Sequence, residues 1–269
     1  MGVVNATPDS FHAVSRTEAR DAAVARALRL VDEGADVLDL GGESTRPGAA
    51  PVAADAESAR VVPVLDGLRG RVTVPISIDT YKASVARAAV AAGASIVNDV
   101  SGGLLDPAMP ETVAQLGVVA IVGHLRGTPA TMRERARYAD VVREVAGELA
   151  ERVATFRAAG VAAEKLWIDP GFGFAKNHEH NLALLDGLGE IAGLGQPVVV
   201  GLSRKRFLGD ILRGQGLGGE DTDDRLEASL AAATLAAARG AILVRTHDVA
   251  PTRRAIALVD ALRGSREGI

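Results

Sequence analysis

The chain has 269 residues, of which 48% are hydrophobic and 24% charged, and its formal net charge is −4. This composition is ordinary for a globular protein, and the length suits one large α/β domain or two small ones. The negative charge argues against a general role in binding nucleic acid or a membrane surface.

The sequence contains no cysteine, which excludes disulfides, thiolate nucleophiles and cysteine metal sites and fits a reducing compartment. No apolar run approaches the length of a membrane span, and no signal peptide precedes the first expected strand. We therefore expect a cytoplasmic protein with no nucleic-acid partner and no membrane partner.

Short apolar runs alternate with amphipathic stretches along the whole chain. The runs predict strands at residues 2–5, 37–40, 74–78, 95–97, 118–122, 165–168, 197–200 and 241–244. The first helix is predicted to begin at a capping box at residues 15–18 and to end at Gly34, and the second to pass through Val61 and Leu65. Further helices are predicted at residues 85–92, 107–116, 138–159, 182–188, 224–239 and 249–262. Strands that are apolar on both faces and alternate with helices imply parallel pairing. Eight such units predict a single (β/α)8 TIM barrel, one domain over residues 1–269, with its active site at the C-terminal face of the strands.

A doubly wound sheet is the alternative architecture. It requires a glycine-rich phosphate loop after its first strand. The one glycine repeat of that kind, Gly214, Gly216 and Gly218, follows an expected helix instead of a strand, so we reject it as a dinucleotide fingerprint.

Polar residues follow most of the expected strands. They are Asn5, Thr45, Arg46, Asp79, Asn98, His124, Asp169, Lys205, Arg245 and His247. Helix capping or a solvated loop explains a few such residues, Thr80 and Asp99 among them. It does not readily explain so many charged groups at one barrel mouth, because burying them without a ligand or solvent costs several kcal/mol. A small-molecule site is therefore favoured.

The segment DPGFGFAK, residues 169–176, holds two of the five phenylalanines. It follows an expected strand, and its proline and glycines require the chain to turn there. Taken alone, the segment is as consistent with an ordinary βα turn as with a binding site.

The residue types suggest a ligand with two chemically different ends. Asp79 and Asp169 can accept paired N–H donors from a ring, and Asn98 can donate and accept beside them. Arg245 and His247 offer a guanidinium fork and a ring donor that suit a phosphate.

Two further side chains fit a phosphate group. Lys205, at the start of the helix after the seventh strand, adds a point charge in the part of a barrel that commonly binds phosphate. Asn5 is a candidate oxygen ligand for Mg²⁺ if a diphosphate completes the coordination. Residues 178–180, His-Glu-His, read as a solvated helix start and not as a zinc site.

Eight segments together carry a family resemblance: NATPDSF (residues 5–11), GGESTRPG (41–48), IDT (78–80), NDVSG (98–102), RGTP (126–129), DPGFGFAK (169–176), SRK (203–205) and RTHD (245–248). In this order, and over nearly the whole chain, they resemble the dihydropteroate synthases, folate-biosynthesis enzymes of the pterin-binding barrel family. Each segment is weak alone, and the ordered set is specific.

The resemblance implies condensation of 7,8-dihydropterin-6-ylmethyl diphosphate with 4-aminobenzoate, with Mg²⁺ as cofactor. The implied pterin ligands are Asp79, Asn98, Asp169 and Lys205; the implied diphosphate ligands are Arg245, His247 and, through Mg²⁺, Asn5. Thr45, Arg46, Pro47, Phe11 and Phe174 would border the aminobenzoate pocket. Asp79, Lys205, Arg245 and His247 are the implied catalytic residues. A dissociative loss of diphosphate needs no protein nucleophile. The family is commonly homodimeric, and the Ala-rich helix at residues 226–238 is a candidate interface.

The chain departs from the family pattern at three places. Ala13 stands where an Asp of the first loop is expected; Gly123 and Leu125 replace two Met around His124, which predicts a larger or looser pterin pocket. Members usually carry a segment before the first strand, and Met1 stands almost on it, which predicts a trimmed N-terminus or a weaker closure at the bottom of the barrel.

Two other functions remain open on the sequence. Ala13 favours a weak or inactive homologue that only binds pterin diphosphate, whereas the intact pterin and diphosphate residues argue against it. A corrinoid-dependent methyltransferase of the same superfamily is the other, and the residues 44–47 and 245–247 favour the synthase over it.

Overall fold

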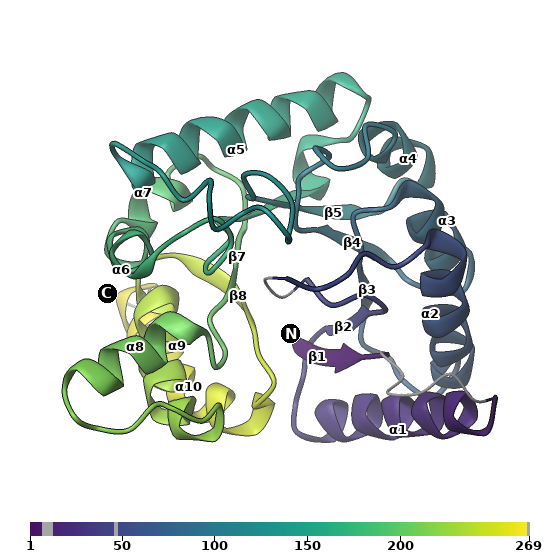
Figure 1. Cartoon of the computed structure of the whole chain (residues 1–269), viewed down its shortest axis with the longest axis horizontal. Coiled ribbons are helices and arrows are strands. Elements are labelled where there is room, and N and C mark those ends of the chain that lie inside the picture. Colours follow the sequence, from purple (N-terminus) through teal and green to yellow (C-terminus); the bar gives the residue numbers. More distant parts are fainter. Residues whose placement is uncertain (7–12, 46–47, 268–269) are drawn as a thin grey trace.

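A computed structural model describes residues 1–6, 13–45 and 48–267 as eight parallel strands surrounded by helices (Figure 1). The strands are β1 (Gly2–Asn5), β2 (Leu38–Gly41), β3 (Ile76–Asp79), β4 (Ile96–Asp99), β5 (Val119–Gly123), β6 (Leu166–Asp169), β7 (Val198–Gly201) and β8 (Ala241–Arg245). They pair in chain order within one sheet. The predicted (β/α)8 barrel is confirmed.

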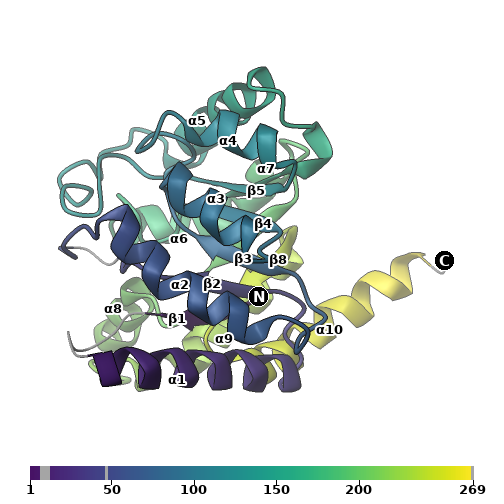
Figure 2. The ribbon, with the colours of Figure 1, turned by 90° about the vertical axis from the view of Figure 1, so that its right-hand side faces the viewer.

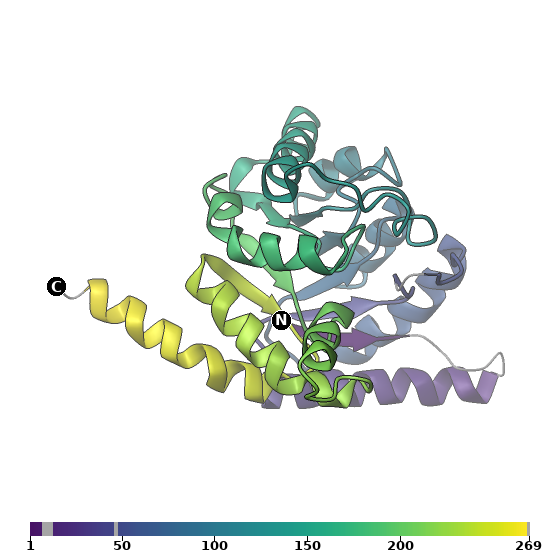
Figure 3. The same cartoon turned by 60° about the vertical axis from the view of Figure 1, so that its left-hand side comes forward.

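The helices are α1 (Ala13–Asp32), α2 (Ala54–Leu68), α3 (Ala83–Ala91), α4 (Met109–Leu116), α5 (Val141–Ala158), α6 (His178–Asp186), α7 (Leu188–Ala192), α8 (Arg206–Gly214), α9 (Leu226–Ala238) and α10 (Val249–Glu267). The last of them, α10, runs well beyond the barrel at its C-terminal end (Figures 2 and 3). No helix in the described part of the chain combines the length and hydropathy needed to cross a membrane.

The barrel closes between its last and first strands. Gly2 and Thr246 form one isolated parallel bridge, in which Val3 N–H donates to the Thr246 carbonyl at 3.1 Å and Thr246 N–H donates to the Met1 carbonyl at 2.9 Å. The neighbouring pair β1 and β2 has four residues in register. The seam between β8 and β1 is therefore sparsely paired, as is the contact between β6 and β7, which has one residue pair in register.

Side chains alternate between the barrel interior and the helix layer. Val37, Ile96, Ile121 and Val199 form a buried cluster inside the barrel with Met1, whereas the outward strand residues join the larger core under the helices. Because the period of a strand is two residues, the next inward positions after these apolar ones lie at the C-terminal mouth. That alternation places Asp39 two residues after Val37, and Asn98 two residues after Ile96.

Some predicted helix boundaries were wrong. The first helix begins at Ala13 and not at a cap on Ser15. Helix α5 begins at Val141, because the Asp140 side chain accepts the Arg143 N–H and caps it. The helix predicted at residues 182–188 begins earlier, at His178.

The early start of α6 has a local cause that the sequence reading missed. Asn177 accepts the backbone N–H of His180, and the His180 ring accepts the backbone N–H of Asn177. This is a capping box with imidazole in the place of the usual Glu or Gln. The residues 178–180 are thus a helix start, as expected, and no group of three metal-ligating side chains occurs anywhere in the described residues.

Candidate active site

The centre of the barrel mouth holds an arginine from β8 that is paired with two aspartates, one from β2 and one from β3. Arg245, at the end of β8, donates from Nε to Asp39 Oδ2 at 2.5 Å and from Nη2 to Asp79 Oδ2 at 2.7 Å. Burial lowers the pKa of Arg245, but the charges of Asp39 and Asp79 outweigh burial and raise that pKa above its ordinary value. The three side chains form one ion-pair chain, Asp39–Arg245–Asp79.

Asp79 is only half satisfied by this arrangement. Its Oδ1 atom is buried and has no hydrogen-bond partner among the described residues. Burial raises the pKa of Asp79 to about 7, against the opposing effect of Arg245 and with a further increase from Asp39. An unpaired buried carboxylate oxygen is costly, and an N–H donor of a bound ligand would remove that cost.

Asn98 and Asp169 lie around the same mouth. Asn98 stands directly across from Asp79 in the β3–β4 register, and its Nδ2 donates to Asp39 Oδ2 at 3.3 Å. Asp169, at the end of β6, accepts the Gly171 N–H on Oδ1 at 2.8 Å, and burial raises its pKa. The mouth thus offers a further amide and a further carboxylate to a planar ligand.

Lys205 adds a second cation. It directly precedes α8, and among the described residues its ammonium has no hydrogen-bond acceptor; its closest partner is the Phe174 ring, 4.4 Å from Nζ to the ring centroid. Burial, and after it the charge of Arg245, lower the pKa of Lys205 to about 8. Three carboxylates therefore face two cations across the mouth: Asp39, Asp79 and Asp169 against Lys205 and Arg245.

Strand-end glycines leave room above this layer. A Cβ on Gly41 would lie 3.6 Å from the nearest Asp79 atom, and one on Gly201 would lie 3.9 Å from the nearest Arg245 atom, both ordinary contact distances. Gly123 differs, because a Cβ there would lie 2.6 Å from Val100 Cα. The predicted enlargement at Gly123 is therefore wrong: the backbone of the loop after β4 fills the space that a side chain would occupy.

The remaining predicted residues are more scattered. His247 is held by Ser203, whose Oγ lies 3.1 Å from His247 Nδ1, while the Arg245 guanidinium is turned toward the aspartates. Thr45 is half-buried in the loop after β2, and Asn5 is exposed at the end of β1, opposite Gly41. Phe11, Arg46 and Pro47 lie outside the described residues.

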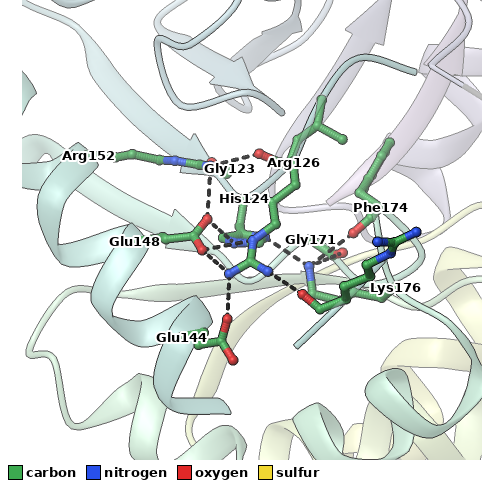
Figure 4. Close-up of polar contacts among 11 residues, drawn as sticks. Gly123, His124, Arg126, Glu144, Glu148, Arg152, Gly171, Phe174 and Lys176 are labelled. Carbon is green, nitrogen blue, oxygen red and sulfur yellow. Dashed lines mark hydrogen bonds and ion pairs between the residues drawn. The ribbon is translucent and has the colours of Figure 1, made fainter. Parts of the chain in front are cut away.

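His124 does not face the mouth, contrary to expectation. Its side chain is fully buried, with Nε2 3.0 Å from Glu148 Oε2 and Nδ1 2.9 Å from Lys176 Nζ (Figure 4). Leu125 is buried in a cluster with Met132 and Ala175, and Phe174 packs against this cluster. The loop after β5 is therefore anchored on α5.

A family of pterin binding enzymes matches the chain over residues 1–247. Dihydropteroate synthase of Escherichia coli (strain K12) is 41% identical over 267 residues, which cover 99% of this chain and 92% of the relative. The chain belongs to the dihydropteroate synthase family. The corresponding enzyme of Mycobacterium leprae is 45% identical over 262 residues, 97% of this chain and 92% of the relative. The family resemblance drawn from the eight sequence segments is confirmed.

Solved structures of dihydropteroate synthases share the fold. One from Xanthomonas albilineans with 4-aminobenzoic acid has a TM-score of 0.88 at 46% identity and covers 98% of this chain and 92% of its own. Another from the same organism, with 7,8-dihydropteroate, has a TM-score of 0.85 at 43% identity, with coverage of 98% and 92%. A Yersinia pestis enzyme in a sulfonamide complex has a TM-score of 0.89 at 38% identity, with coverage of 98% and 93%. Nothing in these matches favours the binding-only homologue or the methyltransferase.

In this member of the dihydropteroate synthase family, two sets of residues around the site were not predicted from the sequence. Asp39 was assigned to a buried strand, although an acid two positions after an inward valine signals the barrel mouth. Lys176, Glu148 and Arg152 were assigned to a loop and to an amphipathic helix. Their contacts with the loop after β5 are non-local, and no spacing within the sequence indicates them.

The chemistry of the donor set fits Mg²⁺ only as a partner of a diphosphate. The described residues contain no group of three or more His, Asp or Glu side chains that could enclose an ion. Asn5 presents a single amide oxygen at the rim, and Mg²⁺ commonly keeps several waters and binds through few protein oxygens plus substrate phosphates.

Proposed function

We infer that the protein is a dihydropteroate synthase, a transferase of folate biosynthesis. It joins 7,8-dihydropterin-6-ylmethyl diphosphate to 4-aminobenzoate and releases diphosphate, giving 7,8-dihydropteroate. The observation that carries this function is the half-satisfied Asp79 carboxylate at the mouth of a barrel whose relatives are dihydropteroate synthases along nearly their whole length.

The pterin ring would lie over the charged layer. Asp79 Oδ1 would accept an N–H of the ring, and the free oxygen of Asp169 would accept another. Asn98 would bind the edge of the ring between them. Lys205 has unused donors and would donate to an acceptor atom of the pterin ring. Its positive charge would then lie beside the ring while the electron distribution of the ring changes during the reaction.

The diphosphate would lie toward the loop after β8. Arg245 and His247 leave the same strand end. A guanidinium has five N–H donors, of which Arg245 gives two to Asp39 and Asp79, so the others can bind phosphate oxygens. The bond between the pterin methylene carbon and the diphosphate oxygen breaks, and both electrons leave with the diphosphate. These two side chains would stabilise the growing negative charge.

The arylamine completes the transfer. Its nitrogen forms the new carbon–nitrogen bond to the methylene cation and loses a proton to water. Holding the two reactants in line supplies much of the rate, and no protein nucleophile takes part. Mg²⁺, when bound, would neutralise diphosphate charge, and Asn5 would supply the oxygen that this chain offers to it.

The aminobenzoate would lie at the rim, between Thr45 and Phe174, with Phe11, Arg46 and Pro47 as further proposed contacts. The relatives solved with 4-aminobenzoic acid and with a sulfonamide support this assignment by analogy. We expect sulfonamides to compete with 4-aminobenzoate here.

We propose that the protein is a cytoplasmic homodimer, and exposed apolar side chains on the last part of the barrel support the dimer. Leu235 on α9 is 46% exposed, Ile242 on β8 is 57% exposed and Leu258 on α10 is 65% exposed. An outward strand residue such as Ile242 is normally covered by a helix in a barrel, and a second copy would cover it. Analytical ultracentrifugation tests this, with Ile242→Glu expected to shift the protein toward the monomer.

Product formation from purified protein tests the proposed function. With the pterin diphosphate and Mg²⁺ present, we expect diphosphate release and dihydropteroate formation that both depend on 4-aminobenzoate. Tight pterin diphosphate binding without any aminobenzoate-dependent product would overturn the synthase assignment.

A further inference from the structure

We propose that Lys176, held from behind by His124 and Glu148, is a positioning residue that fixes Phe174 and so sets the affinity for 4-aminobenzoate. The inference rests on the proposed function, because it concerns the second substrate of that reaction. It starts from a buried lysine that directs two of its three side-chain hydrogen bonds at the backbone of one loop.

Lys176 Nζ has three acceptors. It donates to the carbonyl oxygens of Gly171 and Phe174, both at 3.1 Å, and to His124 Nδ1 at 2.9 Å (Figure 4). Burial lowers the pKa of Lys176 well below its ordinary value, and the charge of Asp169 opposes this. The three acceptors match the three N–H bonds of an ammonium, so the protonated form uses all its donors. Two of the three end on the backbone of the 169–176 loop, which is thereby tied to its own last residue.

His124 can accept from Lys176 because its ring is neutral. Burial, and after it the charge of Lys176, lower the pKa of His124 to about 3. A neutral ring that donates from Nε2 to Glu148 Oε2 at 3.0 Å keeps its Nδ1 lone pair for the lysine. Glu148 therefore selects the tautomer that Lys176 requires.

Helix α5 fixes this chain of contacts to the scaffold. Glu144, Glu148 and Arg152 are four residues apart and share one face of the helix. Arg126 donates from Nη2 to Glu144 Oε2 at 2.8 Å and from Nε to Glu148 Oε1 at 2.8 Å. Arg152 donates to the carbonyls of Gly123, at 2.6 Å, and Leu125, at 2.7 Å, on either side of His124.

The other face of the 169–176 loop belongs to the reaction. The Phe174 ring lies 4.4 Å from Lys205 Nζ, and the Phe174 carbonyl is the atom that Lys176 holds. Asp169 is held separately, since its carbonyl accepts the His124 N–H at 3.0 Å and its Oδ1 accepts the Gly171 N–H. Loss of the Lys176 ammonium should therefore release Phe174 far more than Asp169.

Kinetics on Lys176→Met test this separation, with Lys165→Met as the matched control at an exposed lysine that donates to the Gly117 carbonyl. We expect KM for 4-aminobenzoate to rise about tenfold, the scale of one lost charge-assisted hydrogen bond, with the Kd of the pterin diphosphate within about threefold of wild type. A proportional rise of both constants, or no rise in KM, would overturn the proposal.

Restoring the ammonium gives a second readout. Because the natural chain has no cysteine, Lys176→Cys introduces a single thiol, which 2-bromoethylamine converts to an aminoethyl side chain after unfolding in urea. Refolded, aminoethylated protein should regain a KM for 4-aminobenzoate near that of wild type carried through the same steps. A KM that stays at the level of unmodified Lys176→Cys would contradict a role for the ammonium.

Amide hydrogen exchange tests the positioning role of Lys176 without any need for the enzymatic reaction. Without any substrate, Lys176→Met should exchange faster at residues 170–176 while β6 keeps its protection. Unchanged exchange in the loop would refute the positioning role, whereas absence of product from wild type would refute only the proposed function.

If Lys176→Met does not fold, Glu148→Gln should show the same KM and exchange changes at smaller size, and their absence would refute the proposal.

Discussion

The two sides of the 169–176 loop each hold a lysine, half-buried Lys205 and buried Lys176, and the two lysines have opposite surroundings. On the mouth side, Lys205 has no hydrogen-bond acceptor among the described residues and touches only the face of Phe174. On the side of α5, Lys176 uses all three donors on protein acceptors. Removing an ammonium from water costs several kcal/mol unless hydrogen bonds replace it. A buried cation with its donors satisfied therefore serves the fold, and one with free donors is placed for a ligand.

The largest expected effect is on activity at the mouth. Lys205→Met should lower kcat/KM by about 100- to 1,000-fold, the usual scale for losing a preorganised charge at a reacting centre. Because it removes a half-buried cation that has no hydrogen-bond acceptor among the described residues, the free energy of unfolding should stay the same or increase. Urea unfolding measured beside the kinetics checks this, and a clear loss of stability would break the comparison with Lys176.

The opposite pattern is expected for stability on the side of α5. Lys176→Met leaves two backbone carbonyls and the His124 ring without their donor, so the free energy of unfolding should fall by about 2–3 kcal/mol. The same urea titration measures it, with Lys165→Met expected to change it by less than about 0.5 kcal/mol. Equal values for the two variants would mean that the three hydrogen bonds of Lys176 contribute little.

The pH dependence of pterin binding tests the role of the charged groups on the mouth side. The pKa of Asp79 is raised to about 7, and N–H donors of a ligand bind its ionised form. As pH rises from 6 to 8, the ionised fraction and with it the affinity for the pterin diphosphate should increase about tenfold. Isothermal titration measures this, and Asp79→Asn should bind more weakly and lose the dependence; a slope retained in Asp79→Asn would assign the titration to another group.

The smallest expected effect concerns Glu148. Its folded pKa is lowered to about 2 from the model-compound value of 4.5; burial opposes this, and the hydrogen bonds from His124 and Arg126 outweigh burial. A lowered carboxyl pKa stabilises the fold above about 4.5, and this contribution is lost as pH falls toward 2. Glu148→Gln should therefore lower the free energy of unfolding by about 1 kcal/mol at pH 7, a value discounted for partial exposure, and should flatten its decline between pH 4.5 and 2. An unchanged acid profile would show that another carboxylate governs it.

Much of the fold could be predicted because its signals are local. Each strand is an apolar run, and Gly34, Gly117 and Gly160, which end helices, all adopt positive φ, where glycine has no steric cost. Asp79, Asn98 and Asp169 were found because each stands at the end of such a run. The same reasoning missed Asp39, since one more apolar residue follows it and hides the strand end.

The rest of the site depends on contacts across the fold. Nothing near Glu148 in the sequence indicates that its partner is His124, 24 residues away. The prediction at Gly123 failed for a related reason, because the backbone at Val100 occupies the space that a side chain on residue 123 would need. Sequence patterns place residues on elements, and packing between elements decides which of them meet.

The ion-pair chain Asp39–Arg245–Asp79 fastens β8 to β2 and β3 across the seam where β8 and β1 share one bridge. The Arg245 guanidinium, which is proposed to bind the leaving diphosphate, thus also holds strands of the barrel wall together. Substitutions at Arg245 that alter catalysis should therefore also weaken the wall. Because Arg245 has both roles, we expect it to tolerate few substitutions during evolution. New substrate preferences are then expected to arise from changes at the rim of the mouth.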